Sequence, residues 1–301
     1  MNGYASEGYA ISLSEFGQPR FLPMSEGWIQ ERLIQNSSQK DARAMYPLFS
    51  CNKWTHLPQD LDVLQQDSGL VSLVIVTDPF GDYDEGLLHY CFPDLVRPFK
   101  RHYLVDMISP FQVSKHHRYY TRKSLEKVRV ETCTNPIDLL DEWMALYGVL
   151  VSRHKITGIQ TFSQRAFEQQ LALPNVTAFC SLLGDRIIGM HLWIRGNDIA
   201  YSHLTAFHEE GYQLNASYAL YSYAIDYFAG QVRWLDLGSG AGFEDNANDG
   251  LSKFKRGWSN AERNVYLCGR IFDRTAYDLL IQQHGIKPTT FFPAYRSGDF
   301  Q

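Results

Sequence analysis

The sequence predicts an α/β protein built on a mixed sheet. Three observations lead there: a strand-sized apolar run at 70–77, an amphipathic helix pattern beginning at 137, and three closely spaced strand-like runs between 176 and 207. The chain has 301 residues, of which 45% are hydrophobic and 20% charged, which suffices for one large or two modest cores. This composition excludes disorder along the whole chain.

The first block of expected elements, residues 1–130, alternates strands with helices. Strands are predicted at 27–34, 69–77 and 103–108, and helices at 92–102 and 113–128. After the apolar run, the Asp-Pro-Phe-Gly-Asp cluster at 78–82 turns the chain, because Pro and Gly interrupt regular structure.

The second block, residues 131–301, begins with a helix for which Asn135 is the expected N-cap. The pairs Gly184-Asp185 and Asn197-Asp198 predict hairpin turns, since these residues tolerate the positive φ of tight turns. The turns imply an antiparallel meander. A helix between the strands at 199–207 and 232–237 predicts that those two strands are parallel, and that a cofactor cleft opens where they splay. The elements expected here are helices at 137–151, 163–171, 216–229 and 274–283, with strands at 176–183, 187–194, 199–207, 232–237 and 265–271.

Charge and cysteine content limit the partners. The formal net charge of −5 excludes a protein that coats DNA along its whole surface, and no apolar run is long enough to span a membrane. The five cysteines are odd in number and lack CxxC spacing, so we expect neither disulfides nor a zinc ribbon, and interpret all five as reduced and mostly buried. His116 and His117 are adjacent on a helix and point apart, so no metal site is predicted. The N-terminus lacks the pattern of a secretory signal, which favours a cytoplasmic location.

A basic segment at 97–129 stands out against this acidic background. It is consistent with a phosphate-bearing donor or acceptor. The alternative is an ordinary solvated helix face. The segment holds nine cationic residues against Asp106 and Glu126: Arg97, Lys100, Arg101, Lys115, Arg118, Arg122, Lys123, Lys127 and Arg129.

Three motifs follow one another in the second half of the chain. They are the basic helix and strand SKHHRYYTRKSLEKVRVE at 114–131, the meander followed by GYQLNASYAL at 211–220, and LDLG at 235–238 with DGL at 249–251 and FK at 254–255. In type and order they resemble the GNAT acyltransferase superfamily, and its two-lobed branch of Fem-type peptidoglycan aminoacyl transferases. The resemblance implies two tandem GNAT-like lobes, here residues 1–130 and 131–301.

The resemblance also implies an activity, which is transfer of an acyl or aminoacyl group from an activated donor to the amine of an acceptor. A phosphate-containing acceptor is one of the options. Acyl-CoA, aminoacyl-tRNA and an acyl carrier protein all remain open as donors. The phosphate loop R/Q-x-x-G-x-G/A of many GNAT enzymes is replaced by EEGYQLNA at 209–216. The donor would still meet the end of the preceding strand, this loop and the basic turn after it, through Thr205, Phe207, Gly211, Gln213, Asn215, Ala216 and Arg256.

Four residues are candidates for the chemistry. By resemblance, Lys255 occupies the FK position, where an ammonium would neutralise a phosphate or an oxyanion; a solvated basic turn is the alternative. Strand alternation puts His203 on one face with Tyr201 and Thr205, where an imidazole suits a general base, although a lone strand histidine is more often structural. Asp236 ends a predicted parallel strand, where ligands bind in α/β sheets, or else it caps the next loop.

Tyr218 is the candidate acid for the leaving group, or one of several packing rings.

Two alternatives of other classes remain. The DLGSGAG loop at 236–242 matches the glycine-rich loop of S-adenosylmethionine methyltransferases, but only 59 residues follow it, too few for the strand and helix units which that fold requires. The altered loop at 209–216 also allows a GNAT fold that has become a catalytically inactive binding module.

Overall fold

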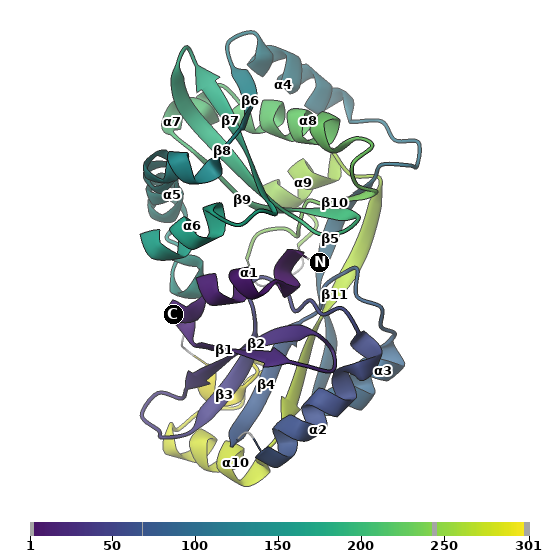
Figure 1. The fold of residues 1–301 in the computed structure, drawn as a ribbon, viewed down its shortest axis with the longest axis vertical. Coiled ribbons are helices and arrows are strands. Elements are labelled where there is room, and N and C mark those ends of the chain that lie inside the picture. The colour runs from purple at the N-terminus through teal and green to yellow at the C-terminus, as the bar shows by residue number, and fades with distance from the viewer. Residues whose placement is uncertain (1–2, 68, 243–245, 298–301) are drawn as a thin grey trace. The chain divides into compact units, whose positions relative to one another are not determined.

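The computed structural model describes residues 3–67, 69–242 and 246–297 (Figure 1). The chain forms two compact units, one of residues 1–99 with 265–301, the other of residues 100–264. This division differs from the expected boundary at residue 130. The C-terminal segment returns to the first unit, and the order of elements along a sequence does not reveal such a return.

The first unit contains a sheet in the order β1-β2-β3-β4-β11. Strand β2 is antiparallel to both β1 and β3, and β3 is parallel to β4. The end of β11 is antiparallel to β4, with Cys268 opposite Ile75. The elements are β1 (Gln18–Leu22), β2 (Gly27–Leu33), β3 (Lys40–Ala44), β4 (Leu70–Val76), β11 (Ala261–Ile271), α1 (Glu7–Ser12), α2 (Leu57–Asp67), α3 (Glu85–Cys91) and α10 (Arg274–Gln283), with 3-10 turns at Gly3–Ala5, Ser14–Phe16, Trp54–His56 and Ala294–Arg296.

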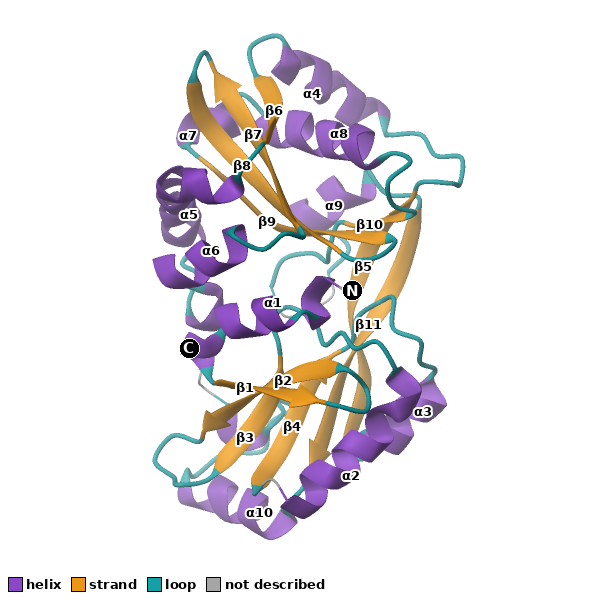
Figure 2. Ribbon diagram, viewed as in Figure 1, coloured by secondary structure: helices purple, strands orange, loops and turns teal. Residues whose placement is uncertain are grey.

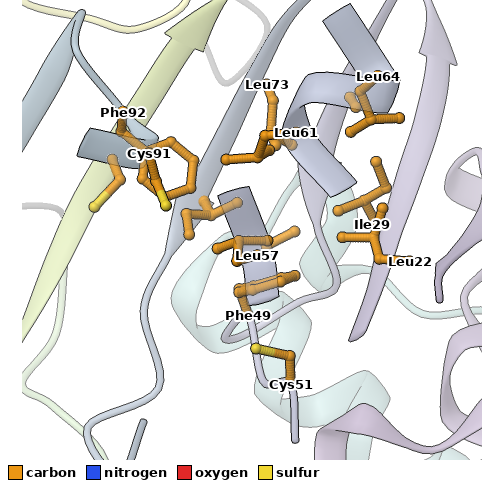
Figure 3. Packing of buried hydrophobic residues seen from close by; sticks show 14 of the residues in the cluster. Leu22, Ile29, Phe49, Cys51, Leu57, Leu61, Leu64, Leu73, Cys91 and Phe92 are labelled. Carbon is orange, nitrogen blue, oxygen red and sulfur yellow. The ribbon is translucent and has the colours of Figure 1, made fainter. Parts of the chain in front are cut away.

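Helix α2 supplies much of the first core. Leu57, Leu61 and Leu64 follow the i, i+4, i+7 spacing of one helix face and are buried. Figure 3 shows them directed towards Ile29 and Leu73 of the sheet. Burial of this leucine face holds α2 on the sheet, since each fully buried leucine contributes about 1.5–3 kcal/mol.

The second unit contains a sheet in the order β5-β10-β9-β8-β7-β6. Strand β10 is antiparallel to β5 and parallel to β9, and β9 to β6 form an antiparallel meander. The elements are β5 (Leu95–Asp106), β6 (Arg129–Cys133), β7 (Val176–Leu183), β8 (Arg186–Arg195), β9 (Ile199–Phe207), β10 (Trp234–Asp236), α4 (Lys115–Leu125), α5 (Leu140–His154), α6 (Gln164–Leu171), α7 (Glu209–Gln213), α8 (Ala216–Phe228) and α9 (Gly250–Arg256), with 3-10 turns at Pro136–Leu139 and Gly158–Gln160.

Helices cover both faces of the second sheet (Figure 2). Helices α4 and α8 pack together on one face, and α5 contacts β8 and β9 on the other. The α8 face carries a large apolar core, with Trp193, Leu220 and Leu235 buried in one cluster. Of the helices in the described residues, none is long and apolar enough to cross a bilayer.

Most expected elements of the second half are confirmed, including the strands at 176–183 and 199–207 and the helix at 274–283. The helix expected at 92–102 is wrong, because residues 95–106 form one continuous strand, β5. From Lys100 onward, alternate side chains of this strand point to opposite faces, so Lys100 and His102 are buried on one of them. The polar residues on this buried face gave the segment the pattern of an amphipathic helix, which led to the wrong prediction.

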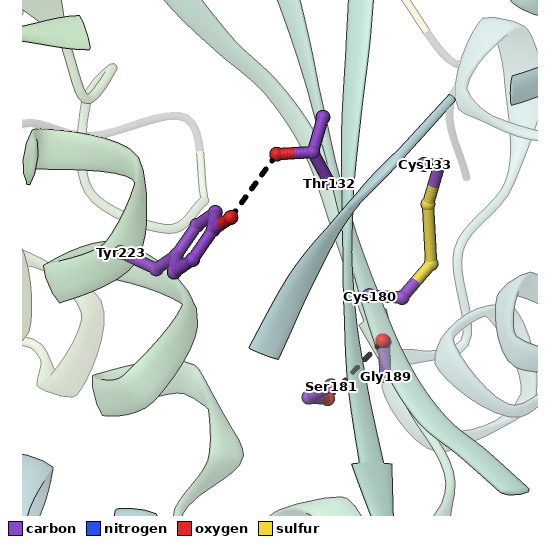
Figure 4. Close-up of a disulfide and its surroundings, with 6 residues drawn as sticks. All are labelled: Thr132, Cys133, Cys180, Ser181, Gly189 and Tyr223. Carbon is purple, nitrogen blue, oxygen red and sulfur yellow. Dashed lines mark hydrogen bonds between the residues drawn. A yellow bond between two sulfur atoms is a disulfide. The ribbon is translucent and has the colours of Figure 1, made fainter. Parts of the chain in front are cut away.

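The interpretation of all cysteines as reduced is also wrong. Cys133 of β6 and Cys180 of β7 form a disulfide on the sheet face opposite α8, as Figure 4 shows. On the other face, Thr132 contacts the Tyr223 hydroxyl of α8. The sequence separation of 47 positions concealed a pair of cysteines that strand register brings together. Cys51, Cys91 and Cys268 are free and buried.

Candidate functional site

The candidate site lies where β9 and β10 part. The two strands are parallel, as expected, and pair only over three positions, Ile199–Tyr201 with Trp234–Asp236. Strand β9 continues to Phe207, while the chain after Asp236 stays hydrogen-bonded to β5 through Leu237 and Gly238. Polar side chains of β8, β9, α8 and α9 gather beyond the last shared pair.

A bulge in β9 decides which of its side chains take part. The register between β8 and β9 shifts after Leu192, so that Ser202 lies opposite Trp193 and Thr205 opposite His191. Both hydroxyl residues therefore face α8, where the Tyr221 hydroxyl lies 3.4 Å from Ser202 Oγ and also contacts Thr205. The extra residue at the bulge moves His203 off this face.

His203 is therefore not on one face with Thr205, and the expectation from strand alternation is wrong on this point. Its Nε2 lies 3.2 Å from Gln170 Oε1 of α6, on the opposite side of the sheet. Burial lowers the pKa of His203 to about 3, so the imidazole is neutral at physiological pH and is a weak base. These contacts fit a structural histidine.

His191 of β8 lies nearer to the parting strands. Its Nε2 is 2.8 Å from Ser202 Oγ, and its buried Nδ1 has no hydrogen-bond partner among the described residues. Burial and the charge of Lys255 both lower the pKa of His191, so its ring is neutral. His191 was not predicted from the sequence, because the residues beside it in the strand are apolar.

Lys255 is brought to the same place by a short helix. Asp249 caps α9 by accepting hydrogen bonds from the backbone N–H groups of Leu251 and Ser252. Lys255 is only 9% exposed, and its Nζ donates to the carbonyl of Ser239 at 2.7 Å. Burial lowers the pKa of Lys255 to about 8, and Lys100 adds to this effect, whereas Asp236 and Asp249 oppose it. A buried ammonium of this kind stabilises negative charge strongly, because little water screens it.

The glycine-rich loop after β10 forms a second wall of the site. Gly238 has φ +76, which favours glycine, and a Cβ there would lie 3.0 Å from Lys255 Nζ. A Cβ on Gly240 would lie 2.1 Å from Ser252 Oγ. Lys100 Nζ donates to the carbonyl of Ala241 at 3.2 Å. The glycines thus let the loop lie directly against the lysine and the start of α9.

Asp236 connects the loop to β5. Its Oδ1 accepts a hydrogen bond from Gly238 N at 2.7 Å, and its Oδ2 lies 2.8 Å from His102 Nδ1. Both side chains are buried. The contact with Gly238 fits the interpretation of Asp236 as a cap of the next loop, and its charge raises the pKa of Lys255. A ligand contact by Asp236 stays a prediction. His102 was missed because its segment was taken for a helix.

Except for Arg256, the residues expected to hold the donor lie between the end of β9 and the start of α8. A single short helix, α7, spans Glu209–Gln213, and a Cβ on Gly211 would lie 2.4 Å from the carbonyl of Ile188. Glu209 pairs with Arg153, and Glu210 with Arg186. Phe207 packs against Tyr212, while Gln213, the left-handed Asn215 and Ala216 lead into α8. Each of these two carboxylates is balanced by an arginine, so the four side chains add no net positive charge for a pyrophosphate.

Tyr218 and Arg256 have other neighbours. The Tyr218 ring stacks on Tyr120 of α4 with centroids 5.2 Å apart, and its hydroxyl lies 3.3 Å from His116 Nε2. Burial raises the pKa of Tyr218. Arg256 donates to the carbonyl of Ala247. Within residues 3–67, 69–242 and 246–297, no group of three His, Cys, Asp or Glu side chains is placed to hold a metal ion.

Comparisons with known proteins bear on the family and the fold. Residues 112–256 match the family model described as an acetyltransferase (GNAT) domain. No curated protein matches the sequence. The fold is similar to the crystal structure of FemX, with a TM-score of 0.68, 10% identity, and coverage of 91% of this chain and 93% of that one.

Two further structures are similar over nearly the whole chain. The C-terminal domain (DUF2156) of a protein named as a lysylphosphatidylglycerol synthetase from Agrobacterium fabrum has a TM-score of 0.62 at 14% identity, with coverage of 93% of this chain and 92% of that one. The L-PGS of Bacillus licheniformis has a TM-score of 0.59 at 14% identity, with coverage of 94% and 98% respectively.

The chain contains a GNAT acetyltransferase domain over residues 112–256, which supports its assignment as an acyltransferase. Within that superfamily, the chain has the two-lobed fold of the Fem-type branch. The loop DLGSGAG lies inside the matched GNAT domain, which leaves no support for the methyltransferase alternative.

Proposed function

We propose that this protein transfers an acyl or aminoacyl group from an activated donor to an amine, and that Lys255 stabilises the oxyanion formed in the reaction. The observation that carries the proposal is the buried Lys255 ammonium at the point where β9 and β10 part. GNAT membership supports acyl transfer in general. The neighbour named as a lysylphosphatidylglycerol synthetase favours including aminoacyl groups.

In acyl transfer to an amine, the most important group is a cation that lies close to the carbonyl oxygen of the donor. The acceptor nitrogen attacks the donor carbonyl carbon, a C–N bond forms, and the carbonyl oxygen takes the negative charge. Collapse of this intermediate breaks the bond to the leaving thiol or alcohol, which receives the proton lost by the amine. With its pKa at about 8, Lys255 is mostly an ammonium at neutral pH and can stabilise the oxyanion.

The other residues have supporting roles in the proposal. Asp236 holds the 238–242 loop through its hydrogen bond to Gly238, and its negative charge raises the pKa of Lys255. Thr205 and Tyr221 line the donor side of the parting strands. Tyr218 remains the proposed acid for the leaving group. The low pKa of His203 argues against its use as the base, so the acceptor amine enters unprotonated. Acyl-CoA is the proposed donor, with aminoacyl-tRNA or a carrier protein as alternatives, and the proposed location is the cytoplasm.

A thermal-shift titration tests the ligand class first. We expect acetyl-CoA or a longer acyl-CoA to raise the melting temperature, because a ligand that binds only the folded state stabilises it. S-adenosylmethionine is the negative control. Stabilisation by S-adenosylmethionine alone would overturn the proposal.

The Lys255→Met variant then tests the chemistry. Met has a similar length and no charge, so we expect transfer to fall about 100-fold or more, by analogy with removal of one oxyanion donor. Lys253→Met is the matched control, since Lys253 lies on the same helix and is exposed. Full transfer by Lys255→Met, measured with the donor that gave the thermal shift, would refute the role of Lys255.

A further inference from the structure

A basic hollow on the second unit lies outside the site described above. It measures about 840 Å³ and is bounded by the segment before α4, by α4 itself, by α8 and by the residue pair after α9. Figure 1 shows α4 and α8 side by side. The side chains lining the hollow include Lys115, Arg118 and Arg122 of α4, Ser222 of α8 and Trp258.

No carboxylate of the described residues neutralises the three cations, although Arg118 donates a hydrogen bond to the carbonyl of Val113. Lys115, Arg118 and Arg122 are exposed, and none forms an ion pair within the part of the chain that the structure describes. They occur at i, i+3 and i+7, so they form one stripe about 10 Å long on the helix. Lys115 and Arg118 also stand in the first turn of α4, which has no acidic residue, where the helix dipole disfavours positive charge. The helix dipole therefore favours an anion at this end of α4.

The hollow is linked to the reacting end of the site through Trp258. Trp258 is 1% exposed, its backbone N–H donates to the carbonyl of Lys255 at 3.0 Å, and its ring stacks on Tyr221 with a 24° interplanar angle. The wall of the hollow thus includes a residue that is hydrogen-bonded directly to the backbone of Lys255. The α7–α8 junction, in contrast, carries Glu209 and Glu210.

We propose that the hollow beside α4 binds the nucleotide phosphates of the acyl donor, in place of the α7–α8 junction. This inference rests on the proposed function for the identity of the ligand as a donor. Coenzyme A and the 3′ end of a tRNA both contain an adenosine nucleotide with one or more phosphates. This group is the ligand that we propose for the hollow. The recessed shape of the hollow favours such a group over the flat surface of a bilayer.

Equilibrium binding of non-acylated probes tests the site without requiring catalysis. The probes are coenzyme A, an RNA minihelix ending in CCA, and inorganic pyrophosphate, measured by calorimetry at low salt and in 0.5 M salt. We expect Arg118→Gln and Arg122→Gln each to weaken binding of coenzyme A or of the minihelix by about tenfold, the size of one charge-assisted contact. Whichever nucleotide probe responds identifies the donor type. High salt should weaken binding to the wild type more than to the variants.

Two control variants separate the possible locations. Lys123→Gln removes an exposed cation of α4 that does not line the hollow, and we expect less than a twofold change. Ser217→Glu puts a carboxylate in the first turn of α8, which suits the helix dipole but would repel a phosphate bound at the α7–α8 junction. We expect this variant to bind as the wild type does.

The inference is overturned if neither nucleotide probe binds, if pyrophosphate alone binds, or if Ser217→Glu weakens binding while Arg118→Gln does not. These results are distinguishable from failure of the proposed function. Lys255→Met tests transfer and leaves the α4 stripe intact. If the wild type binds the nucleotide probe but transfers no acyl group, only the proposed function is refuted.

Discussion

Replacing Lys255 by Met should make the protein more stable at pH 7 while it abolishes transfer. The Lys255 pKa falls from 10.5 in the unfolded chain to about 8 in the folded protein, which corresponds to about 3 kcal/mol. The largest cause is burial of the ammonium. At pH 7 Lys255 is protonated in both states, so the folded state bears this whole cost.

The direction of the pH dependence follows from the same pKa values. Between pH 8 and 10.5 the unfolded state binds more protons at this position, so the stability of the wild type rises with pH across that window. Met removes the charge but also the hydrogen bond to the Ser239 carbonyl, which is worth about 1 kcal/mol. We therefore expect a net gain of about 1–2 kcal/mol at pH 7, and no gain at pH 10.5.

Urea unfolding at pH 7 and pH 10 measures this difference directly, through the free energy extrapolated to water. Lys253→Met serves again as the matched control, because an exposed lysine has no burial cost to remove. The reasoning is refuted if Lys255→Met destabilises the protein by the same amount at both pH values. That result would mean that the Lys255 ammonium is solvated or fully compensated in the folded state.

Two further predictions concern the disulfide and the loop after β10. Denatured, unreduced protein should contain three titratable thiols, rising to five after reduction, because Cys133 and Cys180 are bonded; five thiols without reductant would contradict the pairing. Gly240→Ala should destabilise the protein by about 1–3 kcal/mol and lower transfer, since its Cβ would meet Ser252 Oγ at 2.1 Å. Gly250→Ala, with open space around its Cβ, should be neutral or slightly stabilising in thermal unfolding, and equal behaviour of the two variants would count against the packing of this loop.

Local sequence patterns predicted much of the secondary structure in the second half of the chain. The meander could be predicted because Gly184 and the Asn197-Asp198 pair give tight turns between β-rich runs, and the start of α6 because Ser163 caps it. Strand β5 could not, because a strand that buries Lys100 and His102 has no hydrophobic alternation. Strands β1 and β3 were also missed, since each is only five residues long and partly polar.

The sequence by itself determined the class of protein and its leading catalytic candidate. The order of the basic helix, meander, DLG strand and FK motif indicated a GNAT acyltransferase and pointed to Lys255. These features are local or depend only on order along the chain, so they can be read without a structure.

Tertiary structure alone decided which side chains surround Lys255. The bulge in β9 put Ser202 in place of His203 on the face that holds Thr205, because one residue of register reverses the face of every side chain beyond it. The pairing of Asp236 with His102 joins positions 134 apart in sequence, and strand register likewise united Cys133 with Cys180. Such contacts depend on which strands become neighbours, and that outcome follows from packing of the whole unit rather than from any local pattern.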